Sequence, residues 1–475
     1  PAVAIGPDGT TYAAWTDTRS GNPQVLVSRL VGGVWTQLAG SAGGNALGAG
    51  VAPSVNAAFA PSIVIDGTGA PIIAWTADHG GGLSDVRVAR YNSVSGQWEA
   101  LGASLGSDGI SATGSAGAVK LVMTSGGPVA VWLDGSAGAQ RIYALRFTGG
   151  AWAEIGAGSA SGNGLAGGSV AADVRDIAVA GDGSRIALAW TQVASGTGVR
   201  QIYLREFSGG AWNAIGGSTT GTGVSGIADA GVSGSISHNA QPSLVYFGGQ
   251  LFVAWQAFSD QAASIAVARF DNTAARTLER IDNFGQTGVP ASPQLSAGGD
   301  ALRLLWQRQP LDNAPTDLYA LRFDASSGHF VQELLGEGSS GGLSDTGGRA
   351  MQLATATDSS GRSVVVWQDA ITGEPEIYAR GMSATITRSF NAIGDDGIQA
   401  ILDANNLGAG DVIVVIGTVT GNVTIAALHA GVTIYGAPGS QIVGTVTVAA
   451  DNVLLQRLQV SGAVNLLGDR SGFTL

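Results

Sequence analysis

The stretch that decides the fold is PSIVIDGTGAPIIAWTAD, residues 61–78. Two apolar runs flank the turn DGTGA, and the second run ends in a tryptophan. That second run is apolar without alternation, so both of its faces must be buried. Two more runs, VRVARYN (86–92) and QWEALG (97–102), complete a unit of four short strands. We therefore expect a small sheet that is packed on both faces by neighbouring sheets.

The unit recurs along most of the chain. Each repeat has a Trp at the end of its second strand, namely Trp15, Trp75, Trp132, Trp190, Trp255, Trp306 and Trp367. An Arg follows 13 to 16 residues later in each repeat, namely Arg29, Arg90, Arg146, Arg205, Arg269, Arg322 and Arg380. A second Trp marks the fourth strand of four repeats, namely Trp35, Trp98, Trp152 and Trp212. Four short strands in a unit of this length are typical of a propeller blade.

The sequence thus predicts an all-β fold with a seven-bladed β-propeller over residues 1–390. The expected blades are near 1–59, 60–117, 118–174, 175–240, 241–291, 292–350 and 351–390. The seventh repeat lacks the second Trp, so its fourth strand is expected within Ala384–Phe390.

Several turns before the anchor Trp combine Asp with Gly, namely Asp8-Gly9, Asp66–Gly69, Asp182-Gly183 and Asp358–Gly361. An Asp oxygen caps turn amides, while Gly supplies a positive φ. These turns are similar to Asp boxes, and the repeat resembles the sialidase-like propellers of secreted bacterial proteins. The resemblance implies the fold and not the activity. A sialidase grips a carboxylate with three Arg and uses a Tyr–Glu pair, whereas the periodic Arg here occupy equivalent strand positions and no Tyr–Glu pair is evident. We therefore expect the Arg residues to be scaffold.

Residues 391–475 follow a different pattern. Trp is absent, and Ile398, Ile401 and Leu402 have helical spacing after Asp395-Asp396, with Gly408 as the expected end. Short Val/Ile strands with Gly turns come next. This segment resembles the N-terminal part of a right-handed parallel β-helix of the pectate-lyase type, with a short capping helix. We expect the β-helix to continue in further chain or to self-associate beyond residue 475; the alternative is an atypical terminal cap.

Composition excludes several classes of function. The 475 residues carry a net charge of −12, which disfavours nucleic acid as a partner. Cys is absent, so disulfides and thiolate catalysis are excluded. No apolar window is long enough for a membrane span. The pattern fits a protein that is secreted or held at the bacterial cell surface, with glycans or cell-surface proteins as partners.

The loops between second and third strands are the candidate binding region, because they share one face with the blade crossovers. Their carboxylates are Asp17, Asp78, Asp85, Asp134, Asp260, Asp312, Asp317 and Asp369. Carboxylate and carbonyl oxygens suit Ca²⁺, so Asp17, Asp78 and Asp85 are candidate calcium ligands, and calcium is the one cofactor predicted. The same loops suit hydroxyl-rich sugars. The alternative is that these Asp residues serve only turn chemistry.

Two hypotheses about function follow. The first is a non-enzymatic structural or adhesion protein (an adhesin, sheath or appendage subunit) that binds glycans or proteins through its propeller loops and has no catalytic residues. The second is a carbohydrate-active enzyme, either a sialidase-like hydrolase or a polysaccharide lyase seated on the β-helix. The sequence favours the first, because no catalytic constellation stands out.

Overall fold

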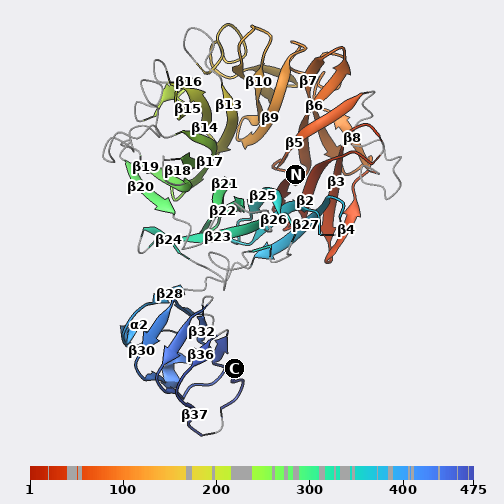
Figure 1. Cartoon of the computed structure of the whole chain (residues 1–475). Coiled ribbons are helices and arrows are strands. Elements are labelled where there is room, and N and C mark those ends of the chain that lie inside the picture. Colours follow the sequence, from red (N-terminus) through yellow and green to blue (C-terminus); the bar gives the residue numbers. More distant parts are fainter. Residues whose placement is uncertain are drawn as a thin grey trace. The chain divides into compact units, whose positions relative to one another are not determined.

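In a computed structural model, the chain forms seven antiparallel sheets followed by three parallel sheets (Figure 1). The structure describes residues 1–19, 21–39, 51, 56–166, 174–194, 198–215, 238–258, 263–271, 276–281, 288–309, 316–325, 328–331, 343–344, 348–371, 373–382, 389–404, 407, 411–436, 439–456, 458–468 and 470–474. Contacts divide the chain into two compact units. One holds β1–β22 and β25–β27, and the other holds β23, β24 and all elements from β28 onward.

Blades 1 to 4 have four strands each, in chain order from the innermost to the outermost (Figure 1). Their strands are β1 (Ala2–Ile5), β2 (Thr11–Asp17), β3 (Gln24–Val31), β4 (Val34–Gln37), β5 (Ala57–Ile65), β6 (Pro71–Gly80), β7 (Leu83–Asn92), β8 (Gln97–Ala100), β9 (Ala116–Thr124), β10 (Gly127–Asp134), β11 (Arg141–Thr148), β12 (Ala151–Glu154), β13 (Arg175–Gly181), β14 (Ile186–Val193), β15 (Arg200–Ser208) and β16 (Ala211–Ala214).

Blades 5 and 6 repeat the four-stranded order, and blade 7 has three strands among the described residues. Their strands are β17 (Asn239–Phe247), β18 (Gln250–Phe258), β19 (Ala263–Phe270), β20 (Arg276–Ile281), β21 (Val289–Gly298), β22 (Ala301–Gln309), β23 (Asp317–Asp324), β24 (His329–Val331), β25 (Met351–Thr357), β26 (Ser363–Asp369) and β27 (Glu376–Met382). The prediction of an all-β, seven-bladed propeller is confirmed.

The second strand of each blade is buried on both faces, as its unbroken apolar run predicts. In β6, Ile73 and Trp75 pack with blade 1, whereas Ile72 and Ala74 pack with blade 3. The anchor Trp of a blade therefore contacts the preceding blade. Six of the seven anchors are only 1 to 4% exposed. Burying an aromatic side chain of this size is worth roughly 2–3 kcal/mol, so the repeated Trp is a main source of blade cohesion.

The Asp–Gly turns connect the first and second strands of their blades. Asp66 Oδ1 accepts the amide N–H groups of Thr68 and Ala70 at 2.8 and 3.0 Å, and Gly69 has a φ of +85°. The periodic Arg of the same blade closes the turn, because Arg90 Nε donates to Asp66 Oδ2 at 2.6 Å. The seven periodic Arg belong to the third strands of seven different sheets, so the prediction that they are scaffold agrees with their positions.

The first strands contain a feature that the sequence analysis did not predict. In five blades, the pairing of the first with the second strand is interrupted by a β-bulge, at which a residue other than Gly takes a left-handed φ of +50° to +54°. These residues are Ala60, Asp176, Gln241, Ser292 and Gln352. Adjacent bulges are linked, since the Ser292 amide donates to Gln241 Oε1 at 2.7 Å and the Gln241 amide donates to Asp176 Oδ2 at 3.4 Å. Strain of this kind persists where the surrounding structure fixes the backbone.

Among its described residues, the C-terminal segment has parallel strands, one α-helix and a short 3₁₀ helix. Its elements are β28 (Ser389–Ala392), α2 (Gly397–Ala404), β29 (Val412–Val415), β30 (Thr418–Thr420), β31 (Val423–Ile425), η2 (Ala427–His429), β32 (Thr433–Gly436), β33 (Gln441–Val443), β34 (Val446–Val448), β35 (Leu454–Gln456), β36 (Gln459–Val460) and β37 (Val464–Leu466). The three sheets have the orders β28-β29-β32-β35, β30-β33-β36 and β31-β34-β37.

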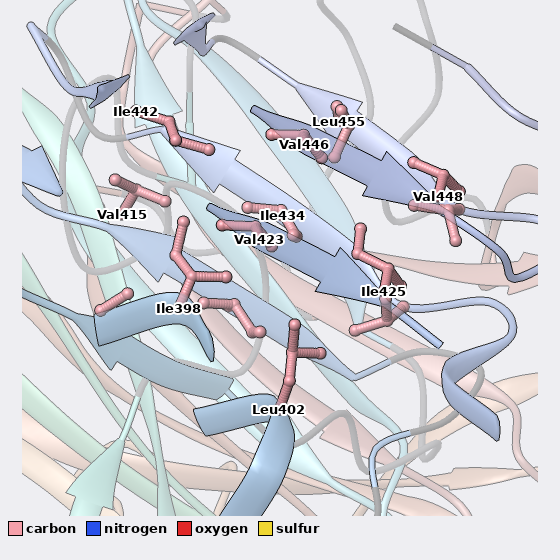
Figure 2. Packing of buried hydrophobic residues seen from close by; sticks show 14 of the residues in the cluster. Ile398, Leu402, Val415, Val423, Ile425, Ile434, Ile442, Val446, Val448 and Leu455 are labelled. Carbon is pink, nitrogen blue, oxygen red and sulfur yellow. The ribbon is translucent and has the colours of Figure 1, made fainter. Parts of the chain in front are cut away.

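The parallel sheets enclose one apolar core, shown in Figure 2. Ile398 and Leu402 of α2 are buried in it, which confirms the predicted helix and its apolar face. The expected helix end at Gly408 lies outside the described residues.

The end of the propeller differs from expectation. Phe390, assigned to the fourth strand of blade 7, lies in β28 and pairs in parallel with Ile413. The expected boundary at residue 390 therefore falls inside a strand of the parallel sheet. The reason is that the backbone of Ser389–Ala392 pairs with β29, whose VIVV run is buried in the parallel sheet. Within the described residues, no helix has the length and apolarity needed to cross a membrane.

Candidate functional site

Three of the predicted loop carboxylates serve the blade framework. Asp17, Asp134 and Asp369 each follow the anchor Trp by two residues and accept its indole N–H, at 3.2, 3.1 and 3.3 Å respectively. In blade 4 the neutral side chain of Gln192 does the same for Trp190 at 2.9 Å. An acceptor is needed here because a buried N–H without a partner is costly. These positions are therefore explained by the repeat itself.

Asp78 and Asp85 hold the loop region of blade 2. Asp78 Oδ1 accepts the amide of Gly80 at 2.6 Å. Asp85 is 5% exposed and accepts the amides of Thr113 and Gly114, both at 3.1 Å. His79 Nε2 lies 3.2 Å from the second Asp85 oxygen. Both carboxylates thus organise loop backbone.

Of the three remaining predicted carboxylates, Asp317 is the one that lies within the described residues. Asp317 Oδ1 accepts a hydrogen bond from Ser344 Oγ at 3.4 Å. Asp260 and Asp312 lie outside the described residues. Across the described part of the chain, no three His, Asp or Glu side chains come together as metal ligands. The calcium site at Asp17, Asp78 and Asp85 stays a prediction.

The structure reveals a site that sequence reasoning missed: a cavity of about 1000 Å³ at the junction of blades 7 and 1. We call it the junction cavity. It lies where Trp15 and Trp35 of blade 1 face blade 7, and it extends to Ala60 of β5, Lys120 of β9 and Gln352 of β25. The cavity therefore extends beyond blades 7 and 1 to the first strands of blades 2 and 3.

The junction is the place where the packing of the repeat changes. Trp15 is only half-buried, unlike the other six anchors. Trp35 is 38% exposed, whereas its equivalents Trp152 and Trp212 are partly buried and donate their indole N–H to the preceding blade, at 2.8 Å to Leu101 O and at 2.7 Å to Ile155 O. Two aromatic side chains that are more buried in other blades thus line one cavity, where a ligand can reach them.

Charged groups line the same cavity. Asp17 is held by Arg19 Nε at 3.0 and 2.9 Å and by Nη2 at 2.6 Å. Burial would raise the pKa of Asp17, but the hydrogen bonds from Arg19 and Trp15 outweigh it and hold the pKa below its ordinary value. The hydrogen bonds to Asp17, together with the charge of Glu376 across the junction, raise the pKa of Arg19. Asp17 and Arg19 are therefore a fixed ion pair, beside the exposed side chains of Glu374 and Glu376.

Lys120 is the one lysine of the chain, and its exposed side chain lines the cavity. Desolvation by the cavity walls lowers the pKa of Lys120, because a charged ammonium is poorly solvated there. Its uniqueness was the one sequence signal that could have pointed to the cavity.

A second polar cluster lies between blades 4 and 5 and contains the Tyr–Glu pair that the sequence analysis did not find. Tyr246 Oη donates to Glu206 Oε2 at 2.6 Å, and the Arg185 guanidinium lies 4.7 Å from the centre of the Tyr246 ring. Burial, with the hydrogen bond to Glu206, raises the pKa of Tyr246. A phenol that keeps its proton is a poor nucleophile, so we interpret this cluster as a lock between two blades.

Comparison with known proteins identifies fold relatives. No family model and no curated protein sequence matches the chain. Among solved structures, it is similar to an α-L-arabinanase from Penicillium chrysogenum, with 10% identity, 69% of this chain and 93% of that chain covered, and a TM-score of 0.40. It is also similar to an ulvan lyase of polysaccharide lyase family PL25, with 15% identity, 80% and 90% coverage, and a TM-score of 0.47. An arabinanase from Bacillus subtilis has 16% identity, 58% and 98% coverage, and a TM-score of 0.31.

The sequence analysis favoured a non-enzymatic structural or adhesion protein, whereas these three solved structures are of carbohydrate-active enzymes. That expectation is corrected and is not carried further.

Proposed function

We propose that this protein is a carbohydrate-active enzyme whose substrate binds in the junction cavity. The observation that carries the proposal is the uncovering of Trp15 and Trp35 in one cavity that also holds carboxylates. Aromatic faces pack against the C–H surfaces of sugar rings, and carboxylates accept hydrogen bonds from sugar hydroxyls. A volume of about 1000 Å³ accommodates a few sugar units.

The reaction that best fits the lining residues is hydrolysis of a glycosidic bond. Such hydrolysis uses two carboxyl groups, one that protonates the leaving oxygen and one that activates water or attacks the sugar. Asp17 is neutralised by Arg19 and stays ionised, so it is unsuited to donate a proton. Glu374 and Glu376 are the other carboxyl groups of the cavity, and we assign the acid and base roles to them. As the C–O bond breaks, one of them gives its proton to the departing sugar, and the water that the other deprotonates forms the new bond.

The test is depolymerisation of a panel of neutral and acidic polysaccharides, followed by reducing-end formation and product length. We expect at least one polymer to be shortened. Glu376→Gln should lower kcat by roughly 10²- to 10⁴-fold without changing the unfolding midpoint. Glu99→Gln, an exposed carboxylate of β8 outside the cavity, is the matched control and should behave as the parent. Full activity of the Glu376 variant would rule out its assigned role, and an absence of cleavage for every polymer would overturn the proposal. Ultraviolet-absorbing unsaturated products would instead indicate a lyase.

We also infer that the C-terminal segment is a right-handed parallel β-helix with α2 as its cap. The support is its regularity, since β29, β32 and β35 begin at Val412, Thr433 and Leu454, 21 residues apart, and pair in parallel. Burial of Ile398 and Leu402 of α2 against the same core supports the capping role. An experimental structure with left-handed or separated coils would refute it.

A further inference from the structure

Lys120 occupies a position in the propeller that no other blade fills with a charged side chain. It lies in the first strand of blade 3 and pairs with Val131, the residue before the anchor Trp. The equivalent residues, paired in the same way in the other six blades, are Ala2, Ser62, Ala178, Ser243, Gln294 and Ala354. The repeat therefore favours a short or neutral side chain at this position.

The structure shows why a short side chain fits there. Ser62 Oγ accepts the amide N–H of Leu121 in the next blade at 2.9 Å, and Ser243 Oγ accepts that of Leu295 at the same distance. A lysine is too long to fit in this way between adjacent first strands, and its side chain lines the junction cavity instead. Lys120 therefore does not accept a hydrogen bond from the next blade, as Ser62 and Ser243 do at the equivalent position.

Lys120 has no counter-ion within the described structure. No carboxylate of the described residues forms an ion pair or hydrogen bond with its ammonium group, and Asp17 in the same cavity is already paired with Arg19. A cation that lines a protein cavity without an anion beside it is incompletely compensated, and an anionic ligand would supply the missing charge.

We propose that Lys120 binds an anionic substituent, a carboxylate or sulfate ester, on the sugar chain in the junction cavity, so that the substrate is an acidic polysaccharide. This inference rests on the proposed function, because it names the substrate class of the same site. A lysine acts as a compact point charge, which suits either oxyanion. Trp15 and Trp35 would hold the ring faces, while Lys120 selects for charge.

The first experiment compares the binding of three probes by calorimetry: polygalacturonate, the same polymer after carboxyl reduction, and a sulfated galactan. We expect the parent to bind at least one acidic polymer about 10-fold or more tightly than the reduced one. Lys120→Met should remove that preference and leave the affinity for the reduced polymer unchanged, whereas Lys120→Arg should keep most of it. An unchanged preference in Lys120→Met would overturn the inference.

A second measurement needs no variant. Because the chain has a single lysine, an amine-acylating reagent and peptide mass spectrometry report on Lys120 alone among the side chains. The preferred acidic polymer should slow acylation several-fold, and the reduced polymer should not. Equal acylation with and without acidic polymer refutes the role of Lys120.

The two proposals fail differently. Cleavage of neutral polymers with no preference for acidic ones would leave the proposed function intact and remove only the role of Lys120. Neither binding nor cleavage of any polymer would remove both.

Discussion

Replacement of Asp134 by Ala tests whether the loop carboxylates belong to the framework or to a binding site. The Asp134 side chain is fully buried and accepts four hydrogen bonds, from Trp132 Nε1 at 3.1 Å, Thr113 Oγ1 at 2.6 Å, and the amide and hydroxyl of Ser136 at 3.0 and 2.5 Å. Its removal leaves the indole N–H buried without an acceptor, which alone costs about 1–3 kcal/mol. With the other lost bonds, we expect Asp134→Ala to lower the free energy of unfolding by roughly 3–5 kcal/mol.

The assay is urea unfolding followed by circular dichroism, with Asp134→Asn as the graded variant. Asn keeps an acceptor for the indole, as Gln192 does in blade 4, so the expected loss is about half as large. Asp108→Ala, which removes an exposed carboxylate, should stay within about 0.5 kcal/mol of the parent. Unchanged stability of Asp134→Ala together with lost sugar binding would refute the framework interpretation.

The difference in unfolding free energy between the parent and Asp134→Ala should depend on pH, because Asp134 has a shifted pKa. Burial would raise that pKa, but hydrogen bonds from Ser136, Thr113 and Trp132 outweigh it and bring it below the ordinary value. Because the pKa of Asp134 is lower in the folded than in the unfolded state, its full contribution to stability is present above the unfolded-state pKa of about 3.9. That contribution is lost as the pH falls through the lower folded-state pKa. The stability difference between parent and Asp134→Ala should be constant from pH 7 to about 4 and narrow below that.

Three further predictions address other parts of the chain. Tyr246→Phe removes the hydrogen bond to Glu206 and should cost about 1–2 kcal/mol of stability while leaving kcat unchanged; a loss of activity at full stability would contradict the lock between blades. Asp66→Asn weakens the contact with Arg90 and should lower the unfolding midpoint at pH 7, and the difference from the parent should narrow as the pH falls below the unfolded-state pKa of about 3.9. Ile398→Ala opens the core under α2 and should cost about 2–5 kcal/mol, measured as faster amide exchange in β29 and β31; unchanged exchange would show that α2 does not stabilise that core.

The junction cavity could not be read from the repeat, and Trp15 shows why. Its local sequence, TYAAWTD, is as apolar as that of the other anchors, which predicts the same burial. Its exposure depends on how blade 7 meets blade 1, which is a contact between segments more than 300 residues apart. The periodic Trp and Arg pattern predicts the features that all blades share. The junction cavity lies where blade 1 departs from that shared packing.

For the loop carboxylates, the sequence suggested a shared binding site, whereas three of them form hydrogen bonds within their own blade. Their common place on one face suggested convergence, but Asp17, Asp134 and Asp369 each turn toward the indole of their own blade. The alternation of side chains along a strand determines which residues share a face of the sheet. It does not determine which neighbouring group a short polar side chain bonds to.

The sequence by itself determined the seven Trp-anchored blades, the Asp–Gly turns and the apolar face of α2, because these depend on local periodicity and on residue types that fit only buried strands, tight turns or a helix. Only the tertiary structure decided the bulges of the first strands, the pairing of β28 with β29, and the meeting of Trp15, Trp35, Lys120 and Glu376 in one cavity. The physical reason is that these features come from the packing of distant segments, where closure of the ring sets which side chains are covered and which stay open to a ligand.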